Sequence, residues 1–117
     1  MEFTLTEEQQ AIQEGIARVM TDFSDEYWLD KDRNGGFPEE FYRAMAEGGW
    51  LGVSFPKEVG GANLGITEAA IMMRTIASSA GAMQAASAIH MNIFGPKAIA
   101  LFGTNQQKSR WLPPIIR

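Results

Sequence analysis

His90 is the only histidine of the chain and the first residue whose chemistry must be weighed. An imidazole can serve as a general base, as a metal ligand or as a hydrogen-bonding group in a cavity wall. Helical bundles that bind two metal ions use Glu-x-x-His pairs, but the residue three positions earlier is Ser87. A nucleophilic triad would need serine and carboxylate partners that nothing near His90 identifies. We therefore predict that His90 lines or closes a cavity, and we assign no catalytic and no metal-binding residue.

The segment that contains His90 carries no charge. Residues 75–96 include no Asp, Glu, Lys or Arg. Their serines, glutamine, histidine and asparagine would be penalised in hydrocarbon, so we predict a buried helix over residues 83–94 and no membrane span. A surface helix keeps a polar face. Both sides of this helix should therefore be covered, one by the core of its own domain and the other by a second domain, a subunit or a ligand.

Helical spacing groups four residues of this segment on one face. Met83, Ser87, His90 and Phe94 follow one another at i, i+4, i+7 and i+11. A low, mostly apolar surface with one or two polar atoms would suit an acyl chain or another slender apolar ligand. The alternative from spacing alone is that the small residues permit close packing between helices. The two interpretations remain open at this point.

The elements that position this segment are also helical. Thr6 with Gln9 and Thr104 with Gln107 are capping boxes that begin helices. The apolar pattern predicts a first helix to Phe23 or Asp25 and further helices over 38–48, 66–76 and 83–94, followed by a short turn to 101 and a short helix from 104. "DKDRNGGF" is predicted to be a loop, and "WLGVSFPKEVGGANLG" a long irregular connection. The fold class is all-α, an up-down helical bundle of about five to six helices with this long irregular loop after the second helix.

Composition excludes several classes of protein. The 117 residues can bury one hydrophobic core, and the absence of cysteine excludes disulfides, thiolate zinc sites and a cysteine nucleophile. All 14 acidic residues lie between Glu2 and Glu68. The few dispersed cations after Glu68 do not form the basic stripe that nucleic-acid binding requires. The acidic N-terminus lacks the apolar core of a secretion signal, so we expect a cytoplasmic protein.

Five segments, in order, resemble the N-terminal helical domain of the acyl-CoA dehydrogenase family. They are "FTLTEEQQAIQEGIARVM", "GGFPEEFYRAMAEGGWLGVSFPKEVGGANLG", "TEAAIMMRTIA", "SAIHMNIFGPKAIALFG" and "GTNQQKSRWLPPI". The most specific are "FPKEVGGANLG", which is similar to the family's Pro-x-x-x-Gly-Gly loop, and "FGTNQQKSRWLP", which is similar to its Gly-Thr-x-x-Gln-Lys-x-x-x-Leu-Pro ending. The resemblance implies that residues 1–117 form this domain and that the middle β-domain and the C-terminal helical domain are absent.

The resemblance also implies the chemistry of a parent enzyme. In the family, a carboxylate removes the α-proton of an acyl-CoA thioester, the β-hydrogen passes as hydride to FAD, and an electron-transfer flavoprotein accepts the electrons. We expect such a parent to be a homo-oligomer. The present chain contains no candidate for the base or the flavin-binding loops, so by itself it is expected to be inactive and free of flavin.

The family's corresponding helix approaches the acyl chain of the substrate. The resemblance places that contact at Ala86, Ser87, His90 and Phe94, largely the residues that helical spacing groups together. Two alternatives remain. One is a domain of an acyl-CoA oxidase or a related flavin monooxygenase, which resemble the dehydrogenases here, and the other is a stand-alone helical binding or scaffold module.

Overall fold

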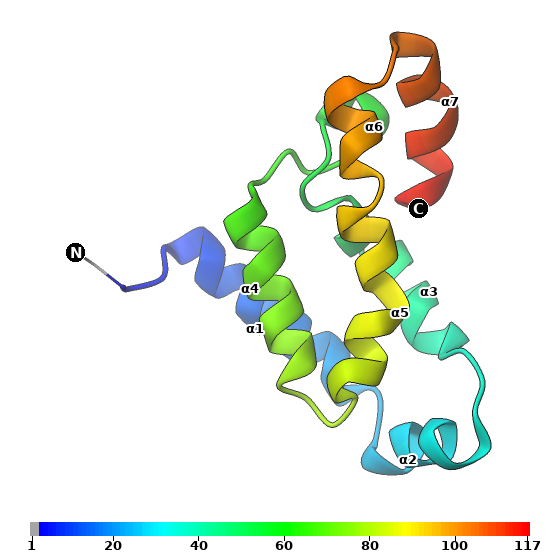
Figure 1. Cartoon of the computed structure of the whole chain (residues 1–117). Coiled ribbons are helices and arrows are strands. Elements are labelled where there is room, and N and C mark those ends of the chain that lie inside the picture. The colour runs from blue at the N-terminus through cyan, green and yellow to red at the C-terminus, as the bar shows by residue number, and fades with distance from the viewer. Residues whose placement is uncertain (1–2) are drawn as a thin grey trace.

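The computed structural model describes residues 3–117 and contains helices throughout (Figure 1). The helices are α1 (Glu7–Thr21), α2 (Asp25–Asn34), α3 (Glu39–Glu47), α4 (Ile66–Ala77), α5 (Ala82–Phe94), α6 (Lys97–Phe102) and α7 (Asn105–Ile115), with 3-10 turns η1 (Trp50–Gly52) and η2 (Lys57–Val59). Residues 3–117 contain no strand. The prediction of an all-α bundle is therefore confirmed, and the long irregular loop follows the third helix, α3, rather than the second.

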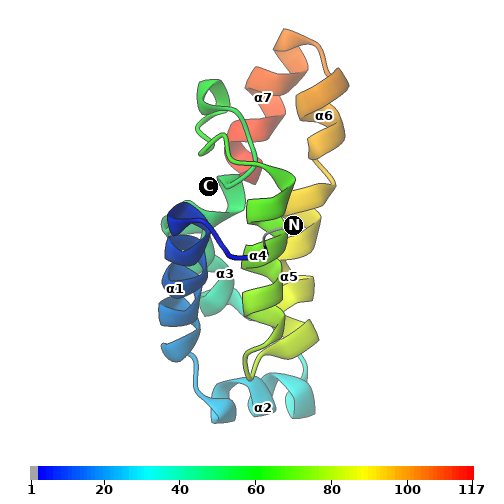
Figure 2. The same ribbon diagram turned by 90° about the vertical axis from the view of Figure 1, so that its left-hand side faces the viewer.

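The bundle is a flattened body that measures 43 × 39 × 20 Å along its principal axes. Helices α1, α4 and α5 extend along its length, as Figure 2 shows. Helix α2 lies across one end of these helices, whereas α6 and α7 lie at the opposite end. No helix among residues 3–117 is both long enough and apolar enough to cross a membrane.

Side-chain caps explain where several helices begin. The Thr6 hydroxyl accepts the Gln9 backbone N–H at 3.2 Å, and the Gln9 side chain accepts the Thr6 N–H at 3.1 Å. Thr104 and Gln107 form the same reciprocal pair at the start of α7. Each box satisfies two backbone donors that would otherwise lack a partner. Both predicted capping boxes are confirmed.

Helix α2 corrects the predicted loop at "DKDRNGGF". Residues 30–34 of that stretch are helical, and the preceding helix α1 ends at Thr21, earlier than predicted. The Ser24 hydroxyl accepts the Tyr27 backbone N–H at 3.2 Å and so begins α2 independently. The helix is polar along most of its surface, but Trp28 inserts into the core with only 3% of its surface exposed. Burial of one aromatic side chain thus stabilises a helix that has little apolar periodicity.

Two hydrophobic clusters hold the elements together. The larger one lies among α1, α3, α4 and α5, where Ile16, Phe41, Met72 and Ile89 are fully buried. The smaller cluster joins the irregular loop to α6 and α7 through Phe55, Val59, Ala100, Leu112 and Ile116. Helix α5 therefore belongs to the main core, and the Gly95-Pro96 bend carries the chain from it into the second cluster.

The long loop is ordered by backbone hydrogen bonds rather than by regular structure. Its returning arm donates from Ala62 to the Gly52 carbonyl at 3.0 Å and from Leu64 to the Val53 carbonyl at 3.0 Å. A β-carbon on Gly61 would collide with the backbone of Phe55 and would lie 2.8 Å from the Gly52 carbonyl oxygen. The second glycine of the "GG" pair is therefore required because two backbone arms meet there.

Candidate functional site

The inward side of α5 is part of the domain core. Ala85, Ile89 and Ile93 are fully buried there, and Ala86 is 6% exposed. Their spacing of three or four residues places them along one stripe of the helix. The structure thus places Ala86 among the buried residues of its own domain. Its contact with an acyl chain stays a prediction.

The opposite side of α5 is open. We call it the outer face of α5 and define it by the exposed residues Met83, Ser87, His90, Met91 and Phe94. Three of them are large apolar side chains with 70%, 66% and 40% of their surface exposed, namely Met83, Met91 and Phe94 respectively. Apolar exposure continues on α6 at Leu101 and Phe102. Several large apolar side chains exposed on neighbouring elements are typical of a site of contact with another molecule or domain.

Ser87, His90 and Phe94 are brought together on this outer face, as helical spacing predicts. No carboxylate and no side-chain hydroxyl within residues 3–117 hydrogen-bonds to the His90 ring. Its Nδ1 instead lies 3.0 Å from the backbone carbonyl oxygen of Ser87. The arrangement therefore lacks the orienting acid that a catalytic histidine uses. That His90 lines a cavity stays a prediction.

Asn92 links the inner side of α5 to two other helices. Its Nδ2 donates to the Tyr42 hydroxyl of α3 at 2.9 Å and to the Ile115 carbonyl of α7 at 3.0 Å. One amide group therefore links the middle of α3 and the C-terminal end of α7 to α5. We did not predict this role from sequence. The available signal was a lone amide in an otherwise uncharged helix, which needs partners if it is half-buried.

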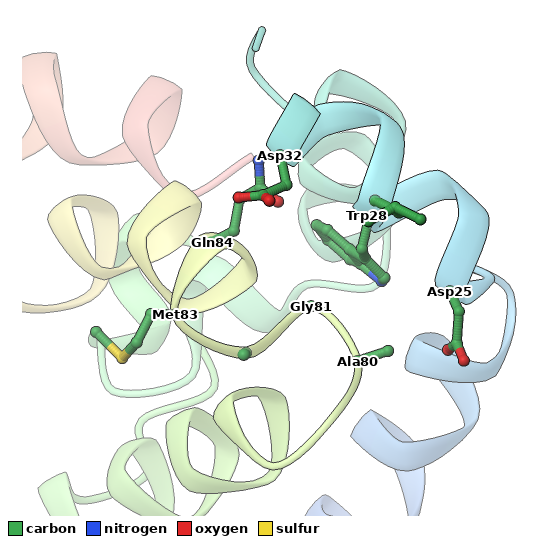
Figure 3. Close-up of a pocket in the computed structure, with 9 residues that line it drawn as sticks. Asp25, Trp28, Asp32, Ala80, Gly81, Met83 and Gln84 are labelled. Atoms are coloured by element: carbon green, nitrogen blue, oxygen red, sulfur yellow. The ribbon is translucent and has the colours of Figure 1, made fainter. Parts of the chain in front are cut away.

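A cavity of about 530 Å³ lies beside the N-terminal end of the outer face. Figure 3 shows α2, which bears Asp25, Trp28 and Asp32, on one side, and the turn into α5, with Gly81 and Met83, on the other. Trp28 Nε1 has no hydrogen-bond partner in the described chain, yet it is sealed from solvent. The cavity therefore presents two acidic groups, the Gln84 amide and an apolar floor.

The perturbed titratable groups lie on α2, α3 and α4. Burial and the hydrogen bond with Glu40 raise the pKa of Tyr27 to about 12. A hydrogen bond from Gln9 lowers the pKa of Glu68, which also caps α4 by accepting the Gly65 N–H. These shifts arise from contacts that join helices and cap them, so they indicate structural roles.

A bound cofactor would require clustered metal ligands or groups that bind phosphates. No group of three or more His, Asp or Glu side chains within residues 3–117 is arranged to hold a metal ion. A dinucleotide such as FAD needs several cations or backbone donors that converge on its phosphates. The cations that line clefts here share them with carboxylates: Arg43 and Arg117 line one cleft with Glu39 and Glu47, and Lys108 lines another with Glu58.

Comparison with known proteins agrees with the sequence resemblance. A family model described as "Acyl-CoA dehydrogenase, N-terminal domain" matches residues 6–117. The chain belongs to the acyl-CoA dehydrogenase family. Its outer face on α5 is thus a surface of an acyl-CoA dehydrogenase N-terminal domain.

Several relatives of this chain are enzymes whose names specify CoA thioesters. The chain is 36% identical over 116 residues to acyl-CoA dehydrogenase FadE12 of Mycobacterium tuberculosis, covering 97% of this chain and 29% of that protein. It is 33% identical over 118 residues to acryloyl-CoA reductase (NADH) of Anaerotignum propionicum, covering all of this chain and 29% of the relative. It is 34% identical over 122 residues to benzylmalonyl-CoA dehydrogenase of Aromatoleum aromaticum, covering all of this chain and 31% of the relative. The chain therefore spans less than one third of the length of these acyl-CoA enzymes.

A solved structure shares the fold of this acyl-CoA dehydrogenase domain. It is described as "Electron transferring flavoprotein of Acidaminococcus fermentans: Towards a mechanism of flavin-based electron bifurcation". One of its chains superposes with a TM-score of 0.89 at 26% identity, over 99% of this chain and 30% of that chain. The arrangement of helices α1 to α7 is therefore also present in an experimentally solved protein.

Proposed function

We propose that this chain serves as the N-terminal helical domain of an FAD-dependent acyl-CoA dehydrogenase, which oxidises the Cα–Cβ bond of an acyl-CoA thioester. Two relatives support a thioester substrate, because their names specify acryloyl-CoA and benzylmalonyl-CoA. A homo-oligomeric, cytoplasmic parent enzyme that passes electrons to an electron-transfer flavoprotein belongs to the same proposal. The family match over residues 6–117 is the observation that carries it.

The contribution we assign to this domain is one wall of the acyl-chain pocket. The outer face of α5 is mostly apolar and uncharged, and its serine keeps the surface low between Met83 and His90. Such a surface can hold an acyl chain and exclude water from it while the rest of the enzyme performs the chemistry. Ser87, His90 and Phe94 are the contact residues in this proposal, together with Ala86 beneath them.

The test uses the natural full-length protein and measures reduction of bound flavin by acyl-CoA thioesters. Ser87→Trp places a bulky ring on the wall and should lower kcat/KM about tenfold or more, since overpacking costs about 1–3 kcal/mol. Gln13→Trp, on the exposed side of α1, is the matched control and should change kcat/KM by less than about twofold. An unchanged kcat/KM for Ser87→Trp would remove α5 from the pocket. Absence of flavin reduction by every acyl-CoA tried would remove the dehydrogenase function.

A further inference from the structure

The outer face of α5 displays few polar side-chain atoms. Met83, Met91 and Phe94 are apolar, so its polar atoms are the Ser87 hydroxyl and the His90 ring. His90 Nδ1 lies 3.0 Å from the Ser87 carbonyl oxygen. A carbonyl oxygen only accepts hydrogen bonds, so the tautomer that makes this bond carries its hydrogen on Nδ1. In that neutral tautomer Nε2 is an unprotonated acceptor, and it makes no hydrogen bond within the described part of the chain.

When a ligand covers the outer face of α5, His90 Nε2 loses its contact with water, and leaving it unpaired then costs free energy. In the open domain, water can bond to Nε2 because His90 is exposed. Once an acyl group and the rest of the pocket exclude water, an unpaired Nε2 is unfavourable. A saturated alkyl chain offers no donor, whereas a hydroxyl group on the acyl chain does. The outer face of α5 is therefore better suited to an acyl group with a hydroxyl substituent than to an unsubstituted acyl group.

A carboxylate is a poorer match for the same position. It accepts hydrogen bonds, as neutral Nε2 does, so the two groups would leave each other unpaired. A buried carboxylate also needs a cation beside it, and residues 75–96 contain no lysine or arginine. A neutral donor satisfies Nε2 without placing a charge in the pocket.

We infer that the acyl group bound against α5 carries a hydroxyl group that donates a hydrogen bond to His90 Nε2. This inference rests on the proposed function and narrows its substrate class from acyl-CoA thioesters to hydroxyacyl-CoA thioesters. His90 acts as a specificity-determining residue, because its Nδ1–H stays bonded to the Ser87 carbonyl and no proton is transferred. The competing partner for Nε2 is a donor side chain from another part of the enzyme, which would leave no preference for a hydroxyl group.

The test compares pairs of acyl-CoA thioesters that are equal in chain length and differ by one hydroxyl group, placed at successive carbons. It uses the natural full-length protein, and it measures both kcat/KM and the dissociation constants of non-oxidisable analogues by calorimetry. The wild-type protein should favour one hydroxylated isomer over its plain counterpart by about tenfold, the scale of one buried hydrogen bond that is made or left unmade. The preference should be present in the dissociation constants as well as in turnover.

Two variants of His90 separate hydrogen bonding from packing. His90→Leu removes the acceptor and should abolish the preference. It should weaken binding of the hydroxylated ligand and strengthen binding of the unsubstituted one. His90→Gln retains an acceptor and should keep part of the preference. Gln13→Leu, on the exposed side of α1 and away from the outer face of α5, is the control and should leave the preference unchanged. Thermal unfolding of each variant verifies that it is folded.

Several results would overturn the inference while leaving the proposed function intact. They are equal binding of plain and hydroxylated ligands by the wild-type protein, tighter binding of carboxyl-bearing acyl groups, or a preference that survives in His90→Leu. In each case acyl-CoA thioesters would still reduce the flavin. If no acyl-CoA thioester binds or reduces the flavin, the proposed function and this inference fail together.

Discussion

Asn92 is the residue whose removal should most directly disturb the position of the candidate wall helix. Its Nδ2 spans two partners, the Tyr42 hydroxyl at 2.9 Å and the Ile115 carbonyl at 3.0 Å. Asn92→Ala eliminates both hydrogen bonds and leaves two polar atoms in a half-buried place without their partner. Since α5 is connected to α3 and α7 by these hydrogen bonds, both helices should be held less firmly against it.

The expected cost follows from these two contacts. A typical intramolecular hydrogen bond contributes about 1 kcal/mol net, and a buried group left unpaired costs about 1–3 kcal/mol. Partial access of water to this place reduces the penalty, so Asn92→Ala should lower the free energy of unfolding by about 2–3 kcal/mol. Tyr42→Phe removes one of the bonds and should cost about 1 kcal/mol.

Urea denaturation followed by far-ultraviolet circular dichroism measures these values on the present chain. The denaturant slope should stay constant while the midpoint falls. Asn34→Ala is the matched control, because that amide donates to Asp30 at 2.7 Å on the exposed side of α2. Its loss should cost less than about 0.5 kcal/mol.

A double-mutant cycle completes the test. Asn92→Ala and Tyr42→Phe share one hydrogen bond, so their effects should fall short of additivity by about 1 kcal/mol. A loss below about 0.5 kcal/mol for Asn92→Ala, or fully additive single effects, would refute the reasoning that this amide holds three helices together.

Two further predictions concern the loop and the cap of α4. Gly61→Ala should lower the free energy of unfolding by about 2–3 kcal/mol, because the added β-carbon would meet the backbone carbonyls of Phe55 and Gly52, which cannot move aside cheaply. Denaturant unfolding should show this loss, and a neutral result would mean that the two loop arms do not approach as closely as described. Hydrogen bonds to Glu68, that from Gln9 foremost, hold the pKa of its carboxyl below the ordinary 4.5. This stabilisation is fully present above pH 4.5 and is lost as the pH falls through the lowered pKa of the folded state. Gln9→Ala should therefore flatten the decline in unfolding free energy on acidification, and an unchanged acid profile would contradict the assigned bond.

Local signals in the sequence predicted much of the fold because they act over a few residues. The capping boxes at Thr6 and Thr104 need only a hydroxyl and an amide three residues apart. Local signals did not predict helix α2, because its charged surface carries little apolar periodicity. Its helix depends on Trp28, which is buried by contacts with Phe23 and Phe41 in other parts of the chain.

The candidate site was likewise predicted in part from the sequence and decided in part by the tertiary structure. Helical spacing placed Ser87, His90 and Phe94 on one face, and the structure brings them together on the outer face of α5. Spacing could not decide which side of α5 faces the domain's own core. That orientation is set by Ile89 and Ile93, which pack inward beside Ala86, and by Asn92, which reaches Tyr42 and Ile115.

By itself, the sequence determined the helical class, most helix boundaries, the uncharged segment of residues 75–96 and the family resemblance. Only the tertiary structure decided that α2 is a helix, that Ala86 lies inward, and that His90 Nδ1 lies on the Ser87 carbonyl while Nε2 has no partner within residues 3–117. The reason is physical. Periodicity and capping depend on neighbours along the chain, whereas burial and the availability of a hydrogen-bonding atom depend on residues that only folding brings together.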